Sequence, residues 1–299
     1  MIKNLLLQDT DLYYEVFGQE NQPSLVLVSG LGSQMIRWDD SFCQLLVQKG
    51  FRVIRFDNRD SGMSVFRTEK ELSFNGNHRE FFTNLKAEDI PYSLMDMAKD
   101  VIGLLDELQI DKAHFVGRSM GGIIAQLLGS YFPERVLSLS IIMSTSLNPA
   151  LPPSDPEIMA MMMKKPVDPN VDKDGYIREK LLFAQKISGD SYAFDESLEI
   201  KMAEEELTRS RTKYGIMRQL LAMASYSYHP EVLKRITVPA LVIHGTQDPI
   251  FHSDCGKDIA DSIPNAKFVG IEGMGHSIPP ELYSFICGQI TTLISEIRE

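Results

Sequence analysis

Residues 113–125 contain the sequence feature that most restricts what this chain can fold into. They read Ala-His-Phe-Val-Gly-Arg-Ser-Met-Gly-Gly-Ile-Ile-Ala, which is typical of a strand, a tight turn and a helix. Ser119 stands at the turn in the pattern Gly-x-Ser-x-Gly, and Gly117 and Gly121 let the strand and the helix approach with no Cβ between them. This geometry would lift the serine hydroxyl out of the sheet edge into a cleft. Because so short a pattern also occurs by chance, its context decides whether it is catalytic.

The composition predicts a folded globular protein. The 299 residues suffice for one large α/β domain or for a core domain with an insertion. With 43% hydrophobic and 24% charged residues, the chain indicates neither disorder nor a membrane span. The net charge of −11 argues against nucleic acid as a partner, since a polyanion would be repelled.

The cysteines and the N-terminus bear on location. Cys43, Cys255 and Cys287 lie far apart without a Cys-x-x-Cys pair, which favours reduced thiols over a disulfide framework or a zinc site. Residues 1–9 have too short an apolar run for a signal peptide. We therefore expect a cytoplasmic location.

Strand-like and helix-like segments alternate in the first and last parts of the chain. Apolar runs that indicate strands cover residues 24–28, 52–57, 136–143, 238–245 and 266–269. Weak alternation over residues 13–17 predicts an edge strand or a hairpin arm. The alternation predicts an α/β fold with a mostly parallel sheet that helices cover on both faces.

Two helices are indicated by their first residues. Ser93 is expected to cap a helix, with Asp96 at the capping-box position. The last helix should follow Pro279 and Pro280. Its apolar residues are predicted to share one face: Leu282, Phe285, Ile286, Ile290, Leu293, Ile294 and Ile297.

Between residues 145 and 230 the strand-like runs disappear, and helix-like segments lie between proline-rich turns. We interpret this segment as a helical cap inserted between two core parts, residues 1–144 and 231–299. The run 158–163, Ile-Met-Ala-Met-Met-Met, is too continuous for an amphipathic stripe, and methionine adapts to irregular apolar surfaces. It forms either ordinary cap core or the lining of a substrate pocket. In the second case Met159, Met162 and Met163 would contact an apolar part of the substrate.

Ser119 needs a base to take its proton and an acid to orient that base. Asp248 directly follows the apolar run 241–245, and His276 follows the strand that ends near Val269. Both should therefore lie on loops at the carboxyl edge of the sheet. His244 lies inside an apolar strand and is expected in the core, and Asp254 is the alternative acid.

The chain resembles the α/β-hydrolases over essentially its whole length. The order serine, acid, histidine is theirs and differs from the chymotrypsin and subtilisin orders. The segments that match are Ser29-Gly30-Leu31-Gly32, 57–62, the turn at Ser119, 245–248 and Gly275-His276. Within that superfamily, residues 57–62 and 273–279 are similar to the aclacinomycin methylesterase-like esterases.

The resemblance implies an oxyanion hole made of the backbone N–H groups of Leu31 and Met120, which leaves both side chains free to line an acyl pocket. Relatives often carry His-Gly where this chain has Ser29-Gly30. The sequence therefore does not indicate which hydrogen bonds support this loop.

Arg118 is a second departure, because relatives more often have an apolar or aromatic residue before the nucleophile. We expect it to pair with a structural acid, the alternative being a substrate carboxylate in the pocket. Arg59 and Asp60 are expected to support their loop.

The resemblance predicts a serine hydrolase without cofactor or metal that cleaves a small-molecule carboxylic ester through Ser119, His276 and Asp248. Thioesterase, enol-lactonase, C–C hydrolase and perhydrolase activities use the same triad and stay open. A ligand-binding protein that has lost the chemistry is the alternative of another class. The sequence does not indicate an oligomeric state.

Overall fold

The computed structural model describes residues 1–68, 86–212 and 214–297. Within them nine strands form one sheet in the order β1-β2-β4-β3-β6-β7-β8-β9, with β5 paired to β2. The strands are β1 (Lys3–Leu6), β2 (Thr10–Phe17), β3 (Ser24–Val28), β4 (Arg52–Phe56), β5 (Val65–Phe66), β6 (Ala113–Arg118), β7 (Val136–Ile142), β8 (Ala240–Gly245) and β9 (Lys267–Ile271). Along the sheet, the neighbouring strands β4, β3, β6, β7, β8 and β9 all pair in parallel. This confirms the predicted mostly parallel sheet.

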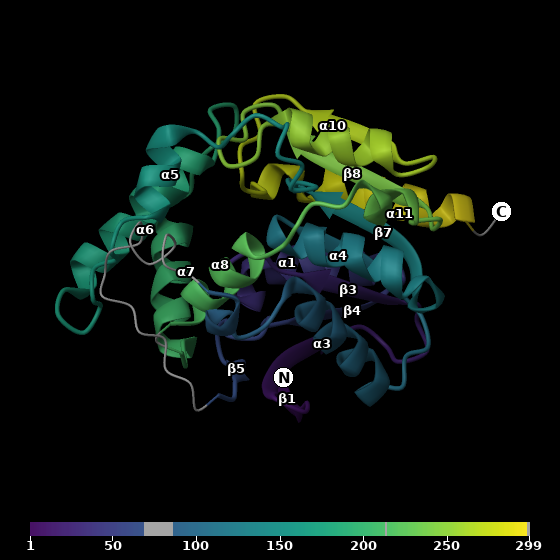
Figure 1. Cartoon of the computed structure of the whole chain (residues 1–299), viewed down its shortest axis with the longest axis horizontal. Coiled ribbons are helices and arrows are strands. Elements are labelled where there is room, and N and C mark those ends of the chain that lie inside the picture. The colour runs from purple at the N-terminus through teal and green to yellow at the C-terminus, as the bar shows by residue number, and fades with distance from the viewer. Residues whose placement is uncertain (69–85, 213, 298–299) are drawn as a thin grey trace.

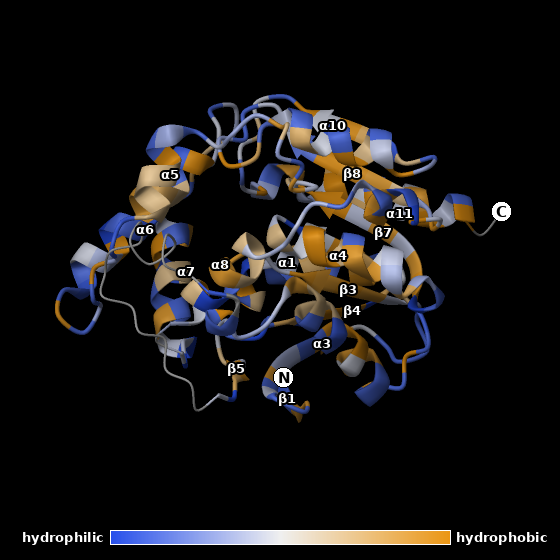
Figure 2. Cartoon of the chain, in the orientation of Figure 1, coloured by the Kyte–Doolittle hydropathy of each residue, from blue (hydrophilic) through white to orange (hydrophobic). Residues whose placement is uncertain are grey.

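Helices cover both faces of this sheet (Figure 1). One face packs against α3 (Leu94–Glu107), α4 (Met120–Tyr131), α9 (Pro230–Lys234) and α10 (Ser253–Ser262). The other packs against α1 (Asp40–Gln48) and α11 (Tyr283–Ile297). The central strands and α4 carry the strongest hydrophobic colour in Figure 2. Every residue of β3 and β4 is buried, as expected for strands enclosed on two faces.

The boundaries of the predicted helices are mostly confirmed. Ser93 and Asp96 form the expected capping box, with the Ser93 side chain accepting from the Asp96 N–H at 3.2 Å. The last helix is preceded by a short 3-10 turn at Pro280–Leu282. Its predicted apolar face is wrong at two positions, since Phe285 is 45% exposed and Ile297 is 39% exposed. Phe285 lies one position off the buried stripe, and Ile297 lies in the last turn.

The strand predicted at residues 13–17 is not at an edge, but it is a hairpin arm, the other alternative, because β1 and β2 are consecutive antiparallel strands. It forms the second half of β2, which lies between β1 and β4 and is antiparallel to both. Residues 3–6, for which no strand was expected, extend the sheet by one further strand.

Between β7 and β8 the chain forms α5 (Pro156–Met162), α6 (Lys173–Ile187), α7 (Glu196–Arg209), α8 (Gly215–Ala224) and α9. Helices α5 to α8 lie together beside the sheet, at the left of Figure 1, while α9 packs on α4 and α10. The division into core and cap at residues 145 and 230 stays a prediction. None of the helices in the described ranges has the length and hydropathy of a membrane span.

Candidate active site

The turn at Ser119 has the backbone conformation that the Gly-x-Ser-x-Gly pattern predicts. Ser119 has φ 54° and ψ −126°, a positive φ that side-chain-bearing residues rarely adopt. A Cβ at Gly117 would stand 2.2 Å from the carbonyl oxygen of Gly121, and one at Gly121 would stand 2.2 Å from that of Val28. Glycine is therefore required on both sides of the serine. Ser119 itself keeps accessible surface.

The three residues predicted to work together lie in one hydrogen-bonded chain. His276 Nε2 is 3.0 Å from the Oγ of Ser119, and His276 Nδ1 is 2.7 Å from Oδ2 of Asp248. Asp248 follows β8 and His276 follows β9, so the parallel strands bring them to the edge where β6 ends at Ser119. An ionised carboxylate only accepts, so Nδ1 of His276 carries the proton and Nε2 accepts from the serine hydroxyl.

Asp248 is held in the ionised form although it is buried. Burial alone would raise its pKa, but the charge of His276 and hydrogen bonds from His244 and His276 hold the pKa well below its ordinary value. Its other oxygen, Oδ1, accepts from the backbone N–H groups of Ile250 and Phe251, both at 2.9 Å. Donors thus surround the carboxylate on both oxygens, which fixes its orientation toward His276.

His244 also touches this carboxylate, which the sequence had not indicated. It is fully buried in β8, as predicted, but its Nε2 is 3.2 Å from Oδ2 of Asp248 and 2.8 Å from the carbonyl oxygen of Phe251. In the sequence, only the four-residue spacing of His244 and Asp248 across the end of a strand could have indicated this contact. The alternative acid, Asp254, is instead paired on the surface with Lys257 at 3.0 Å and with His252 at 3.2 Å.

Two backbone N–H groups beside Ser119 have no hydrogen-bond acceptor among the described residues. Neither the amide of Leu31 nor that of Met120, the first residue of α4, donates to any acceptor in the described ranges. A Cβ added at Gly30 would stand 3.0 Å from the Cβ of Ser119, so the loop after β3 passes close to the serine. The Met120 side chain is fully buried in the core, which argues against the expectation that it lines an acyl pocket.

The loop that carries Leu31 is held by hydrogen bonds that do not involve the Ser29 side chain. Asn58 Nδ2 donates to the carbonyl oxygen of Ser29 at 2.9 Å, and the N–H of Met35 donates to Oδ1 of Asp57 at 2.7 Å. The N–H of Gly32 donates to Oε1 of Gln219 at 2.7 Å. The Oγ of Ser29 is buried and has no hydrogen-bond partner within the described ranges. The segment after β4 and helix α8 therefore supply the support that the resemblance left open.

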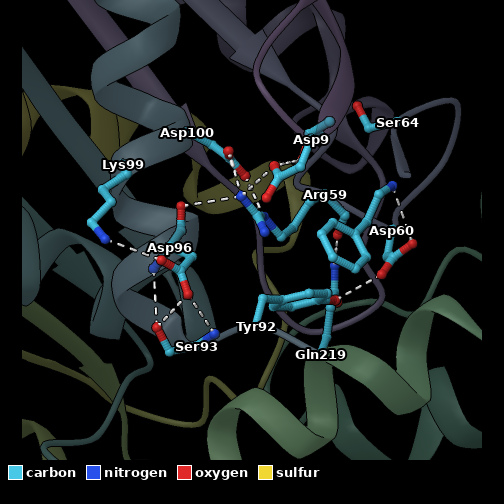
Figure 3. A network of polar contacts seen from close by, with 12 residues as sticks. Asp9, Arg59, Asp60, Ser64, Tyr92, Ser93, Asp96, Lys99, Asp100 and Gln219 are labelled. Atoms are coloured by element: carbon cyan, nitrogen blue, oxygen red, sulfur yellow. Dashed lines mark hydrogen bonds and ion pairs between the residues drawn. The ribbon is translucent and has the colours of Figure 1, made fainter. Parts of the chain in front are cut away.

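Arg59 and Asp60 support their loop, as expected, and Figure 3 shows the contacts of Arg59 with Asp100 and of Asp60 with Tyr92. Arg59 donates to both oxygens of Asp100, from Nε at 2.6 Å and from Nη2 at 2.7 Å. Asp60 accepts from Tyr92 Oη at 2.9 Å and from two nitrogens of Arg218 at 2.7 Å each. These ion pairs fix the segment that contains Asn58. Because Asn58 bonds the carbonyl oxygen of Ser29, they also help to hold the Leu31 loop.

Arg118 does not pair with a structural acid, which corrects the sequence-based expectation. No carboxylate in the described ranges lies within ion-pair distance of its guanidinium. The Cζ instead lies 4.8 Å from the centroid of the Trp38 ring, and Nη2 donates to the Oγ of Ser33 at 2.7 Å. The nearby acids Glu199 and Glu206 are both bound by Arg37, so the guanidinium has no counter-ion among the residues that the structure describes.

The methionine run lies on α5 and at its end. Ile158 is 3% exposed, whereas Met159 is 42% exposed and Met162 and Met163 are half-buried, so the run is only partly buried and both interpretations stay predictions. Its role as lining for an apolar part of the substrate stays a prediction.

Comparison with known proteins agrees with this architecture. A sequence model described as alpha/beta hydrolase fold matches residues 23–281. Rhodomycin D methylesterase DauP of Streptomyces sp. is 27% identical over 290 residues, covering 91% of this chain and 90% of that protein. The 3-oxoadipate enol-lactonase 2 of Acinetobacter baylyi is 26% identical, with 90% and 87% covered.

Among solved structures, the enol-lactonase from Burkholderia xenovorans superposes with a TM-score of 0.72 at 22% identity, covering 98% of this chain and 100% of the other. At that identity the likeness concerns the fold alone. The family match spans most of the sequence, and the strand order and the turn at Ser119 agree with it. The chain therefore belongs to the α/β-hydrolase fold family.

Proposed function

We propose that this chain hydrolyses a small-molecule carboxylic ester through an acyl-enzyme, with Ser119 as nucleophile, His276 as base and acid, and Asp248 as the group that orients the imidazole. The observation that carries the proposal is the continuous hydrogen-bonded chain from Asp248 Oδ2 through both nitrogens of His276 to the Oγ of Ser119. A serine in an ordinary structural role needs no buried histidine and ionised carboxylate behind it. The methylesterase and enol-lactonase relatives add support.

The first half-reaction forms the acyl-enzyme. Ser119 Oγ attacks the ester carbonyl carbon while its proton moves to Nε2 of His276, and the carbonyl electrons move to the oxygen. Asp248 stabilises the imidazolium that results, because its carboxylate already accepts the Nδ1 proton. When the tetrahedral intermediate collapses, the C–O bond to the alcohol breaks, and His276 gives its proton to the departing oxygen.

The second half-reaction repeats these steps with water. His276 takes a proton from a water molecule, the oxygen attacks the acyl carbon, and collapse returns the proton from His276 to Ser119 Oγ. The products are the carboxylic acid and the alcohol. Atoms and electrons balance without a redox partner.

The amides of Leu31 and Met120 are proposed to hold the oxyanion in both half-reactions. Both lie beside Ser119 and have no acceptor within the described ranges, so they are available to the substrate oxygen. Loss of one such donor typically costs about 2.7–4 kcal/mol in the barrier. Met120 also begins α4, where the helix dipole favours negative charge.

A lactonase is the second candidate, and the enol-lactonase relative is the observation that favours it. A lactone is a cyclic ester, so the steps stay the same except that the alcohol remains attached to the acyl group. Thioester and C–C bond hydrolysis use the same residues, and the proposed helical cap over residues 145–230 is where such enzymes would differ.

The test is hydrolysis of a matched set: 4-nitrophenyl butyrate, a butyryl thioester and a lactone of similar size. We expect the highest kcat/KM for the ester and a loss of about 10³-fold or more in Ser119→Ala. A Ser119→Ala protein that keeps the wild-type rate would overturn the serine mechanism. A preference for the lactone or the thioester would replace the ester assignment.

A further inference from the structure

Arg118 places a cation directly beside the proposed nucleophile. It is the last residue of β6, so its backbone leads into Ser119. The Cζ lies 4.8 Å from the ring centroid of Trp38, whose side chain is 1% exposed, and Nη2 donates to the Oγ of Ser33 at 2.7 Å. The ring and the hydroxyl fix the plane of the guanidinium. Its Nε and Nη1 groups make no hydrogen bond to any atom in the described ranges.

The acidic side chains that influence Arg118 are already occupied. Arg37 donates from Nε to Glu206 at 2.8 Å and from Nη2 to the same carboxylate at 3.0 Å. Its Nη1 donates to Glu199. One guanidinium therefore takes both carboxylates, and the second guanidinium has neither within ion-pair distance.

The electrostatic surroundings leave Arg118 short of negative charge. Burial, followed by the positive charge of Arg37, lowers the pKa of Arg118 to about 10, although Tyr283, Glu206 and Glu199 act in the opposite direction. A buried cation without a partner is costly, and proteins seldom keep one for structure alone. An anion beside this group would offset that cost.

Arg118 is also reachable. Although protein surrounds the guanidinium closely enough to desolvate it, the residue keeps accessible surface, and so do Ser33 and Ser119 on either side. A cation that is desolvated yet accessible next to a nucleophile is suited to bind part of the molecule that the nucleophile attacks.

We propose that Arg118 binds a carboxylate carried by the ester substrate, so that the preferred substrate is an ester with one free acid group. This inference rests on the ester hydrolysis proposed above. Nη2 keeps a second N–H beside the one that Ser33 accepts, so one pair of neighbouring donors, Nε with Nη2 or Nη1 with Nη2, is left for the two oxygens of a carboxylate. Trp38 and Ser33 hold the guanidinium in place. The carboxylate of the substrate would then set its orientation relative to Ser119.

The test compares each 4-nitrophenyl half-ester of a dicarboxylic acid with the neutral 4-nitrophenyl ester of the same acyl length, after subtraction of spontaneous hydrolysis. A second arm places the acid on the leaving group, as in carboxyphenyl butyrates against phenyl butyrate. In the wild type we expect the charged ester to have a kcat/KM at least about tenfold higher in one arm, which corresponds to about 1.4 kcal/mol. The arm that shows the preference identifies the side of the scissile bond on which the carboxylate lies.

The ratio of the two kcat/KM values is then measured in variants. Arg118→Gln should bring the ratio to about one, and Arg118→Lys should keep part of it, because the charge remains without the planar fork. Arg235→Gln, which removes an exposed arginine that makes no ion pair within the described ranges, should leave the ratio as in the wild type.

Two results would overturn the inference: a wild type with no preference in either arm, or a preference that Arg118→Gln leaves intact. If Arg118→Gln does not fold, the inference is tested by the kcat/KM ratio of the wild type and by the reduction of that ratio in Arg118→Lys. Failure of the proposed function is a different result, in which the wild type hydrolyses neither the charged nor the neutral member of any pair.

Discussion

Gln219 accepts a hydrogen bond from the backbone N–H of Gly32 at 2.7 Å through its side-chain oxygen. Its Nε2 donates to the carbonyl oxygen of Arg59, also at 2.7 Å, and the side chain is fully buried. One residue of α8 therefore ties together the loop after β3 and the segment after β4. Because Leu31 precedes Gly32, this contact positions one of the two amides proposed to hold the oxyanion.

Gln219→Met keeps the size of the side chain and removes both hydrogen bonds. We expect kcat to fall about tenfold with little change in KM, because the Leu31 amide is less well placed but still present. Steady-state kinetics on the 4-nitrophenyl ester measure the effect. Gln185→Met, at an exposed position on α6, is the control and should keep the wild-type kcat. An unchanged kcat in Gln219→Met would show that the loop does not depend on α8.

Gly30→Ala tests the close approach of the loop to the nucleophile. A Cβ there would stand 3.0 Å from the Cβ and 3.4 Å from the Oγ of Ser119, so one of the two must shift. Since a small misplacement of reacting groups is costly, we expect kcat/KM to fall about 10²-fold. Gly288→Ala in α11 is the control, because no atom lies within 4 Å of its added Cβ, and its kcat/KM should not change. Equal activities of the two variants would contradict the geometry described.

Asp248→Asn tests which acid orients His276. The amide cannot stabilise the imidazolium and favours the wrong tautomer, so kcat should fall by about 10⁴-fold. Asp254→Asn changes a surface residue paired with Lys257 and should stay within about threefold of the wild type. The reverse pattern of kcat values would identify Asp254 as the acid.

Glu206→Gln tests how much the ion pair between Glu206 of α7 and Arg37 contributes to the free energy of unfolding. The Glu206 carboxylate accepts two hydrogen bonds from Arg37, and the side chain is 10% exposed, so its loss should lower the free energy of unfolding at neutral pH by about 1–3 kcal/mol. Glu204→Gln, in an exposed pair with Lys173 on the same helix, should change it little.

The effect of Glu206→Gln should also depend on pH in one direction. Burial raises the pKa of Glu206, but Arg37 outweighs it and holds the pKa below the ordinary value of 4.5. A carboxyl with a lowered pKa in the folded state stabilises above its ordinary pKa and loses that contribution as pH falls toward the folded value. The difference between wild type and variant, measured by urea unfolding at several pH values, should therefore shrink below about pH 4.5. A difference that grows on acidification would contradict the assignment.

The sequence predicted the parts of the site that follow from strand ends. Ser119 and Asp248 follow the buried strands β6 and β8, and His276 follows β9, and parallel strands end at one edge, so their meeting could be expected. The glycines around Ser119 were likewise readable, because only they allow the backbones to touch there.

Other contacts of the site are not predicted by any local sequence pattern. The bonds of Gln219 and Arg218 to the segment after β4 join residues about 160 positions apart on a helix that has no motif. The contact of His244 with Asp248 depends on how the chain turns after β8. Arg118 was expected to have an acidic partner, but competition from Arg37 for the same carboxylates decides the outcome, and such competition appears only in three dimensions.

The central claim is that His276 and Asp248 activate Ser119. The most direct measurement is reaction of the folded protein with a fluorophosphonate, followed by mass spectrometry of the peptide that contains residues 113–125. The account predicts one phosphonyl group per chain, on Ser119, and much slower labelling in His276→Ala. Absence of labelling in the folded wild type, or labelling at the same rate in His276→Ala, would contradict it.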